Sequence, residues 1–243
     1  MLASATMAAG PLVGTLGEKP LHHDIKYWYA DGGDRVEVPV EGFVVDLVRP
    51  GLLIEIQTRG FSSMKRKLNT LLARHAVRVV HPIASDMWIL KVDETGELLS
   101  RRKSPRRGMA ADLFSELVAF PELIAHPRFS LEVLLVQEEQ VRRHDPARAW
   151  RRRGWVVEER RLLGVTRRLV IDSAPTLANL LPAELPAEFT TAELAQVLGR
   201  PRRLAQQMAY CLRRVRAIEV IGKDGNALVY ARPAGPGLGR GNG

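Results

Sequence analysis

Two short apolar runs flank a turn signal near residue 50. Residues 43–48 (FVVDLV) and 52–56 (LLIEI) are rich in β-branched side chains, and Pro50-Gly51 between them favours a tight turn, so we expect an antiparallel pair of strands. With Pro50 and Gly51 as the loop, the numbers of paired residues sum to 101, which places Asp46 directly opposite Glu55. Gln57 lies two positions beyond Glu55 and therefore on the same face.

Patterns elsewhere in the chain predict an α/β fold with a mixed sheet. Apolar residues at helical spacing indicate helices, and β-branched or alternating runs indicate strands. We expect the strand that begins at Val77 to end at His81-Pro82, and residues 101–107 to form a basic loop. The full set is helices over 21–29, 62–75 and 109–120, strands over 35–40, 77–80, 87–92 and 129–136, and a hairpin of 155–159 and 167–171 through Leu163-Gly164.

A helix-turn-helix pattern lies near the C-terminus. Thr190 and Glu193 match a capping box, Gly199 ends the first helix, and Pro201 begins the second. Two short strands follow, over 217–221 and 227–232, with Lys223 in the turn between them. Two helices followed by a β-hairpin resemble the winged-helix family, with Lys223 at the tip of the wing.

The second of these helices predicts a DNA-binding surface. Arg and Gln read base edges, and Arg also contacts phosphates. From Leu185 onward, nine Lys or Arg stand against four Asp or Glu, which suits a polyanionic partner. A winged helix used for protein contacts is the alternative. The residues outside the apolar stripe that we assign to DNA binding are Arg202, Arg203, Gln206, Gln207, Tyr210, Arg213, Arg214 and, on the wing, Lys223.

The composition supports a nucleic-acid partner and a reducing compartment. The 243 residues are 46% hydrophobic and carry a net charge of +9, which suits DNA as the partner. Cys211 is the only cysteine, so an intramolecular disulfide and a cysteine-based metal cluster are excluded. No apolar run approaches the roughly 18 residues of a membrane span. We expect no membrane contact and a cytoplasmic location.

Asp46 and Glu55 are suited to hold a divalent cation. Mg²⁺ takes oxygen ligands, typically one or two carboxylates, and keeps several waters. Acidic side chains among Val, Leu and Ile are costly to bury without compensation, and such positions often carry chemistry. We expect Mg²⁺, or alternatively Mn²⁺, to be bound by Asp46, Glu55 and the backbone carbonyl of Ile56. A salt bridge to Arg49 or Arg59 is the other interpretation.

This pattern resembles the PD-(D/E)xK nuclease superfamily, which has the restriction-endonuclease-like fold. Its members carry a strand-borne Asp, a turn, and an apolar strand that ends in E-x-K or E-x-Q and enters a helix. Here these residues are Asp46, Glu55, Ile56 and Gln57, and the helix begins at Ser62. The expected order of a helix, three antiparallel strands, a helix and a strand also matches. The resemblance covers about residues 20–140 and implies metal-dependent hydrolysis of DNA phosphodiester bonds by an endonuclease.

Gln57 departs from the usual family pattern, which has Lys at this position. Gln carries no charge, so its electrostatic support for a transition state is weaker. Lys65 and Lys67 on the next helix are candidates to supply that charge, and we include Lys67 among the catalytic residues with Asp46, Glu55 and Gln57. The alternative function is a DNA-binding protein or regulator that has the nuclease fold without its catalysis.

These patterns divide the chain into five segments. They are a disordered leader over 1–17, a nuclease-like domain over 18–172, a Pro- and Ala-rich linker over 173–188, a winged helix over 189–232 and a disordered tail over 233–243. Cutting both strands of a duplex needs two active sites or two binding events, so a homodimer is one option.

Overall fold

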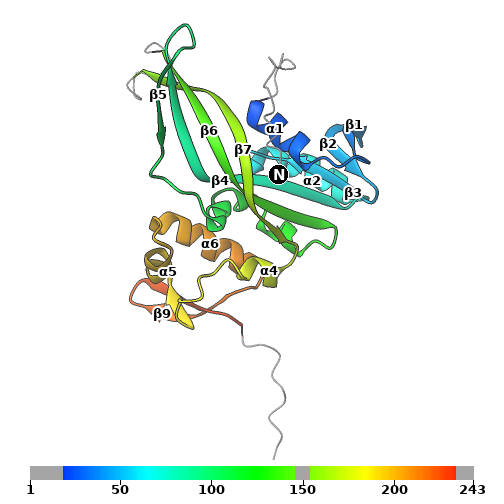
Figure 1. The fold of residues 1–243 in the computed structure, drawn as a ribbon. Coiled ribbons are helices and arrows are strands. Elements are labelled where there is room, and N and C mark those ends of the chain that lie inside the picture. Colours follow the sequence, from blue (N-terminus) through cyan, green and yellow to red (C-terminus); the bar gives the residue numbers. More distant parts are fainter. Residues whose placement is uncertain (1–18, 146–153, 234–243) are drawn as a thin grey trace, which may run out of the picture.

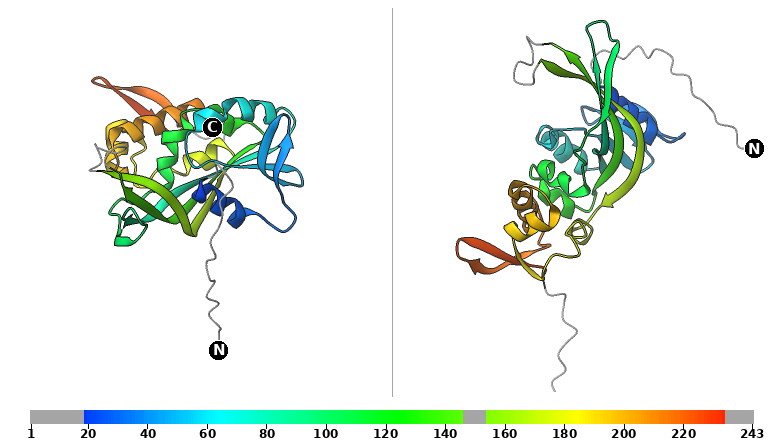
Figure 2. Two further views of the ribbon diagram at one scale, coloured as in Figure 1. Left: turned by 90° about the horizontal axis from the view of Figure 1, so that it is seen from above. Right: turned by 60° about the vertical axis from the view of Figure 1, so that its left-hand side comes forward.

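A seven-stranded mixed sheet forms the centre of the molecule (Figure 1). The computed structural model describes residues 19–145 and 154–233. The strand order is β1-β2-β3-β4-β6-β7, and β5 pairs with β4. The long strands curve together, as Figure 2 shows. The strands are β1 (Arg35–Val40), β2 (Phe43–Arg49), β3 (Leu52–Ile56), β4 (Val77–Val92), β5 (Leu98–Lys103), β6 (Phe129–His144) and β7 (Trp155–Ile171).

The β2–β3 hairpin has the register that the sequence predicts. Its antiparallel pairs run from Arg49–Leu52 to Leu47–Ile54, and the numbers in each pair sum to 101. Gly51 in the turn has a φ of 76°, a backbone conformation that glycine adopts without steric cost. On its other edge β3 pairs in parallel with the start of β4.

β4 is one strand of 16 residues, so the predicted end at His81-Pro82 is wrong. Proline has no N–H and is tolerated in a sheet where no neighbouring strand needs that donor. The carbonyls of Val80 and Ala84 accept hydrogen bonds from Gln57 and Gly108, on the edge away from β6. Pro82 lies between these two residues in β4, just past the end of β3. Its backbone nitrogen faces the same edge of the strand as their carbonyls. The proline therefore marks the point where one neighbour ends, while β6 continues along the other edge.

β7 is also a single strand, of 17 residues, and the predicted hairpin through Leu163-Gly164 is wrong. It pairs with β6 from His144–Trp155 to Leu131–Ile171. The register shifts next to the pair Gln137–Gly164, so this glycine marks a bulge in a long ladder instead of a turn. The predicted basic loop is likewise corrected in part, because β5 extends to Lys103.

Helices cover both faces of the sheet (Figure 2). α1 (Pro20–Tyr29) lies where it is predicted and packs on Leu47, Ile54 and Val80 in a small apolar cluster. The elements on the opposite face are η1 (Phe61–Met64), α2 (Lys65–Leu72), η2 (Ala110–Leu113), α3 (Phe114–Leu117) and η3 (Pro121–Ala125). The predicted helices over 62–75 and 109–120 are therefore shorter, and each begins with a 3₁₀ turn.

The C-terminal unit contains two helices and a small antiparallel sheet in the order β8-β10-β9. The predicted capping box is present, since Thr190 Oγ1 accepts from the backbone N–H of Glu193 and the Glu193 carboxylate accepts from that of Thr190. Gly199 ends the first helix in the left-handed conformation. The elements are β8 (Glu188–Thr190), α5 (Thr191–Leu198), α6 (Arg202–Arg214), β9 (Glu219–Asp224) and β10 (Ala227–Ala231).

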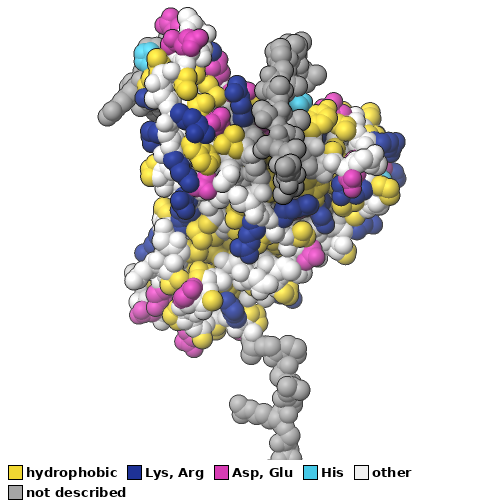
Figure 3. Space-filling model, in the orientation of Figure 1, with side chains coloured by type: hydrophobic (Ala, Val, Ile, Leu, Met, Phe, Trp, Pro, Cys, Tyr) yellow, Lys and Arg dark blue, Asp and Glu magenta, His cyan; other side chains and the backbone are white. Residues whose placement is uncertain are grey.

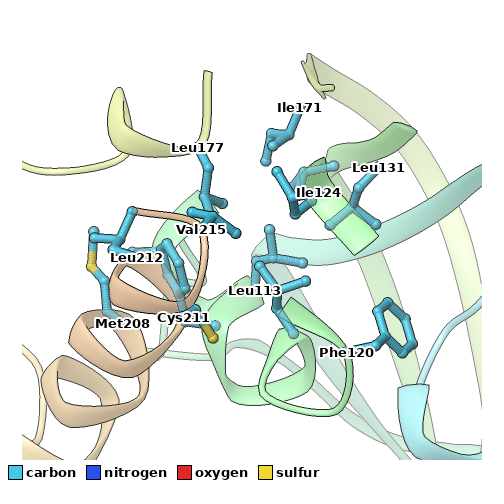
Figure 4. Close-up of a cluster of buried hydrophobic side chains, with 14 of the residues drawn as sticks. Leu113, Phe120, Ile124, Leu131, Ile171, Leu177, Met208, Cys211, Leu212 and Val215 are labelled. Carbon is cyan, nitrogen blue, oxygen red and sulfur yellow. The ribbon is translucent and has the colours of Figure 1, made fainter. Parts of the chain in front are cut away.

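One apolar core joins this unit to the main sheet. Cys211 and Leu212 of α6 lie in the same buried cluster as Leu113 and Phe120 (Figure 4). The predicted linker takes part as well, because it contains α4 (Ala174–Ala178), whose Leu177 is fully buried in that cluster. The two parts of the chain therefore share their hydrophobic stabilisation.

The predicted leader over 1–17 lies outside the described residues, as does the predicted tail after Pro233. Within the part of the chain that the structure describes, no helix has the length and apolar character to cross a membrane.

Candidate active site

The candidate site lies where β2 and β3 separate. Their ladder ends at the pair Leu47–Ile54, one position before Asp46 and Glu55. Beyond it, the backbone N–H of Ile56 donates to Asp46 Oδ2 over 2.7 Å, so a side chain takes the place of a strand partner. This contact orients the Asp46 carboxylate at the gap between the strands. The end of the ladder thus brings the two acidic side chains to the point where the strands stop pairing.

Of the two lysines that the sequence offered as candidates, Lys67 extends from α2 to this site. Its Nζ lies 2.6 Å from Glu55 Oε1, close enough for an ion pair. The same ammonium donates a hydrogen bond to the carbonyl of Val44 over 2.6 Å. Glu55 Oε1 is buried and accepts no hydrogen bond of good geometry from the described residues. The site therefore contains a buried carboxylate oxygen that is engaged by the Lys67 ion pair alone.

The two carboxyl groups have opposite pKa shifts. Burial raises the pKa of Glu55 to about 7, against the attraction of Lys67 and with a contribution from the charge of Asp46. Burial also opposes the ionisation of Asp46, but the hydrogen bond and charge of His22 and the Ile56 N–H together hold its pKa below the ordinary value. Asp46 is thus the ionised member of the pair near neutral pH, and Glu55 titrates there.

His22 is a site residue that the sequence interpretation missed. Its Nε2 lies 3.3 Å from Asp46 Oδ2, and it approaches from α1. The hydrogen bond and charge of this imidazole favour the ionised form of Asp46. His22 has no ligand-like spacing to Asp46 in the sequence, so only the packing of α1 on the sheet brings the two together.

Gln57 lies at the end of β3, but its side chain is engaged by the following loop. Its amide nitrogen donates to the carbonyl oxygens of Arg59 and Gly60. Its backbone carbonyl lies 2.6 Å from His81 Nδ1, and burial lowers the pKa of that imidazole. The catalytic role predicted for Gln57 stays a prediction, whereas Lys67 makes the contact with Glu55.

Asp46, Glu55 and Ile56 form a donor set that fits Mg²⁺ or Mn²⁺. Two carboxylates, a backbone carbonyl and waters are an ordinary set for Mg²⁺. The buried Glu55 Oε1, which only Lys67 engages, is the observation that supports this fit. Among the described residues, no group of three or more His, Cys, Asp or Glu is placed to hold a metal ion. The donor set thus depends on backbone oxygen and water in addition to the two carboxylates.

The predicted DNA-binding residues lie on α6 and on the β9–β10 hairpin, and Arg203 and Gln207 of α6 face the main sheet. Gln207 is half-buried. Lys223 is exposed but lies within β9, paired with Leu228, so its predicted place in the turn is wrong. Arg214 differs from the others, because it forms an ion pair with Glu122 of η3 and so helps attach α6 to the main domain. The remaining exposed residues are Arg202, Arg203, Gln206, Tyr210 and Arg213.

Comparison with known proteins places most of the chain in one family. Residues 19–172 match the model described as Domain of unknown function (DUF8091). The chain belongs to the DUF8091 family. An uncharacterized protein of Treponema pallidum (strain Nichols) is 30% identical over 185 residues, which are 76% of this chain and 74% of that protein. No solved structure matches the chain. The matched DUF8091 region contains Asp46, Glu55 and Lys67.

Proposed function

We propose that this DUF8091 protein is a metal-dependent DNA endonuclease that hydrolyses phosphodiester bonds. The observation that carries the proposal is the position of Asp46 and Glu55 at a strand separation, with Lys67 2.6 Å from Glu55. Two carboxylates and a cationic side chain at one point are the groups that metal-assisted phosphodiester cleavage requires.

The arrangement of the surrounding elements supports the resemblance to the PD-(D/E)xK superfamily. α1 is followed by the antiparallel strands β1, β2 and β3, then by α2 and by β4, which is parallel to β3. This is the order that the resemblance implies. We therefore interpret residues 18–172 as a restriction-endonuclease-like domain and residues 189–232 as a winged helix.

Asp46, Glu55 and the Ile56 carbonyl would hold Mg²⁺ or Mn²⁺. When bound, the cation activates a water and neutralises charge on the attacked phosphate. Glu55 must lose its proton to act as a ligand, and Lys67 favours that loss. The ammonium of Lys67 also offers positive charge to a developing phosphorane, which the uncharged Gln57 does not. α6 and Lys223 would bind DNA through phosphate and base contacts.

The second candidate is a DNA-binding protein or regulator with this fold and no cleavage. The observation in its favour is the engagement of Gln57 by the Arg59 and Gly60 carbonyls, away from the carboxylates. In that case Lys67 serves as a permanent counter-ion that takes the place of a metal at Glu55.

A cleavage assay with and without Mg²⁺ or Mn²⁺ separates the two candidates. Duplex, single-stranded and branched DNA serve as substrates. We expect Asp46→Asn and Glu55→Gln each to abolish metal-dependent cleavage while DNA binding persists. Glu41→Gln is the matched control, because Glu41 pairs with Arg74 outside the site. Full cleavage by both site variants contradicts the nuclease, and binding by wild type without cleavage under all conditions supports the second candidate.

A further inference from the structure

A cleft of about 830 Å³ lies between the main sheet and α6. One wall is formed by residues 81–84 of β4 together with side chains from β6 and β7, and the other by Arg203, Leu204 and Gln207 of α6. The cleft begins at Thr58 and Arg59, which follow β3 and the candidate site. Asp46, Glu55 and Lys67 do not line it, but Thr58 and Arg59 follow the strand that carries Glu55, so the cleft extends from the loop after β3 to the helix that is predicted to bind DNA.

The acidic residues of the cleft are already engaged. Five arginines and three acidic residues line it. Glu138 forms an ion pair with Arg160 over 2.6 Å, and Asp112 pairs with Arg200 over 3.1 Å. The Glu116 carboxylate accepts from the backbone N–H groups of Gly60 and Phe61. Two of the three acidic side chains are thus paired with arginines, Glu116 is held by neutral amides, and the five arginines exceed the three carboxylates by two charges.

Three arginines of the cleft are exposed and unpaired. Arg59, Arg106 and Arg203 come from three separate segments, and no ion pair or hydrogen bond of their side chains is formed with the described residues. Figure 3 shows Lys and Arg side chains running down the β5 side of the molecule toward the C-terminal unit. Three unpaired guanidinium groups around one concave surface favour an extended anionic ligand over a single small anion.

The backbone holds Arg106 in place at this cleft. The N–H of nearby Gly108 donates to the carbonyl of Ala84 over 2.8 Å. A Cβ at Gly108 would lie 2.5 Å from that carbonyl oxygen, so only glycine permits this close approach. The loop that carries Arg106 is therefore fixed against β4 and presents its charge at a defined position.

We propose that this cleft binds a single-stranded segment of DNA and leads it from α6 toward Glu55. This inference rests on the proposed nuclease function and specifies the strand state of its substrate. A cleft of about 830 Å³ lies in the size range of ligand pockets, and we assign a few nucleotides of one strand to it in preference to a duplex. Arg59, Arg106 and Arg203 contact successive phosphates, and Gln207 lies within the same wall for a base contact.

Fluorescence anisotropy with a labelled single strand of about 12 nucleotides tests the proposal. EDTA is present, so binding is measured without cleavage. We expect the triple variant Arg59→Ala, Arg106→Ala, Arg203→Ala to bind about tenfold or more weakly at physiological salt. Its slope of log affinity against log salt should fall by about 2, since each phosphate contact to a single strand contributes about 0.7.

The matched control is Arg35→Ala, Arg66→Ala, Arg102→Ala, which removes the same charge from exposed positions outside the cleft. The control should retain the wild-type affinity within about twofold and the wild-type slope. Equal weakening of both variants, no weakening of the cleft variant, or weaker duplex binding with unchanged single-strand binding would each overturn the proposal.

Photochemical crosslinking of the wild-type protein gives a second measurement that needs no substitution. A single strand containing iododeoxyuridine should crosslink to peptides that contain residues 58–60, 106–108 or 200–207. Crosslinks confined to other peptides refute the cleft. If the wild-type protein binds DNA in the cleft but never cuts it, the nuclease function is contradicted and DNA binding by the cleft is still supported. If the wild-type protein cuts DNA and the cleft variant binds and cuts normally, only the proposal of DNA binding by the cleft is contradicted.

Discussion

Two acidic residues on adjacent strands differ in charge because their surroundings differ. Asp46 receives the Ile56 N–H and the His22 contact, which favour its ionised form. Glu55 is more deeply buried, and Lys67 with a smaller contribution from His22 does not offset the lost hydration, so its pKa rises to about 7. A pair of carboxyl groups with separated pKa values is typical of a site kept for chemistry.

The pKa of Glu55 predicts how stability changes with pH. A carboxyl group with a folded-state pKa of about 7 and an unfolded value near 4.5 binds its proton more tightly in the folded chain. Its contribution to stability is therefore full below pH 4.5 and is lost as the pH rises through 7. At pH 8 we expect Glu55→Gln to be more stable than wild type by about 3 kcal/mol, with little difference at pH 4.5. Urea unfolding at both pH values measures this.

The control for that experiment is Glu41→Gln. Hydrogen bonds from Arg74 and His75 lower the pKa of Glu41, so its shift has the opposite direction. This variant should show no gain in stability at pH 8. A Glu55→Gln variant that is as stable as wild type, or less stable, at pH 8 would contradict the raised pKa.

The role of Lys67 decides whether the site is catalytic or only a structural ion pair with Glu55. If its ammonium supports the transition state, Lys67→Met should lower the cleavage rate by about 10²–10³-fold with little change in DNA affinity. Lys65→Met is the control, because Lys65 is exposed on the same helix. Single-turnover cleavage rates provide the measurement. Equal rates for the two variants would rule out a catalytic role for Lys67.

The chemistry of the site was predictable only as far as local pattern determines it. Turn position and strand period were enough to predict the register of the β2–β3 hairpin, although its ladder ends at Leu47–Ile54, before the predicted pair of Asp46 and Glu55. The choice between Lys65 and Lys67 depends on the direction in which α2 leaves the loop, which no spacing in the sequence specifies. His22 depends on a contact between α1 and β2 across 24 residues of sequence, so it was not identified.

At the scale of elements, the C-terminal unit follows its local sequence signals closely. The capping box of Thr190 and Glu193 satisfies backbone N–H groups at the start of α5. We expect Thr190→Ala to lower the free energy of unfolding by about 1 kcal/mol. Thr191→Ala, one residue into the helix, is the control and should change it by only a few tenths. Urea denaturation followed by circular dichroism measures both, and equal effects would exclude the cap.

The long strands were harder to predict than these helices. β4 and β7 contain a proline and a glycine at which a local interpretation ends the strand. Each continues because β6 lies alongside it, and that neighbour begins more than 40 residues after Pro82. The seven-stranded sheet is thus stabilised by pairings between distant segments, which propensity and period along the chain do not reveal.

At the scale of the whole molecule, α6 and the main sheet are expected to unfold together. Leu212 is fully buried in the shared core. Leu212→Ala should lower the free energy of unfolding by about 2–5 kcal/mol through the cavity that it leaves. All four tryptophans precede residue 172, so their fluorescence reports on the DUF8091 region. A tryptophan transition that shifts with Leu212→Ala demonstrates shared folding, whereas an unshifted transition demonstrates independent units.

The unbroken core has a consequence for the products of the proposed reaction. It extends from Leu212 on α6 to Leu68, the neighbour of Lys67, so packing sets the separation between the cleft and the carboxylates. No hinge is needed to bring the two together. A nuclease built in this way would cut at a constant number of nucleotides from the segment held in the cleft, whatever the base sequence.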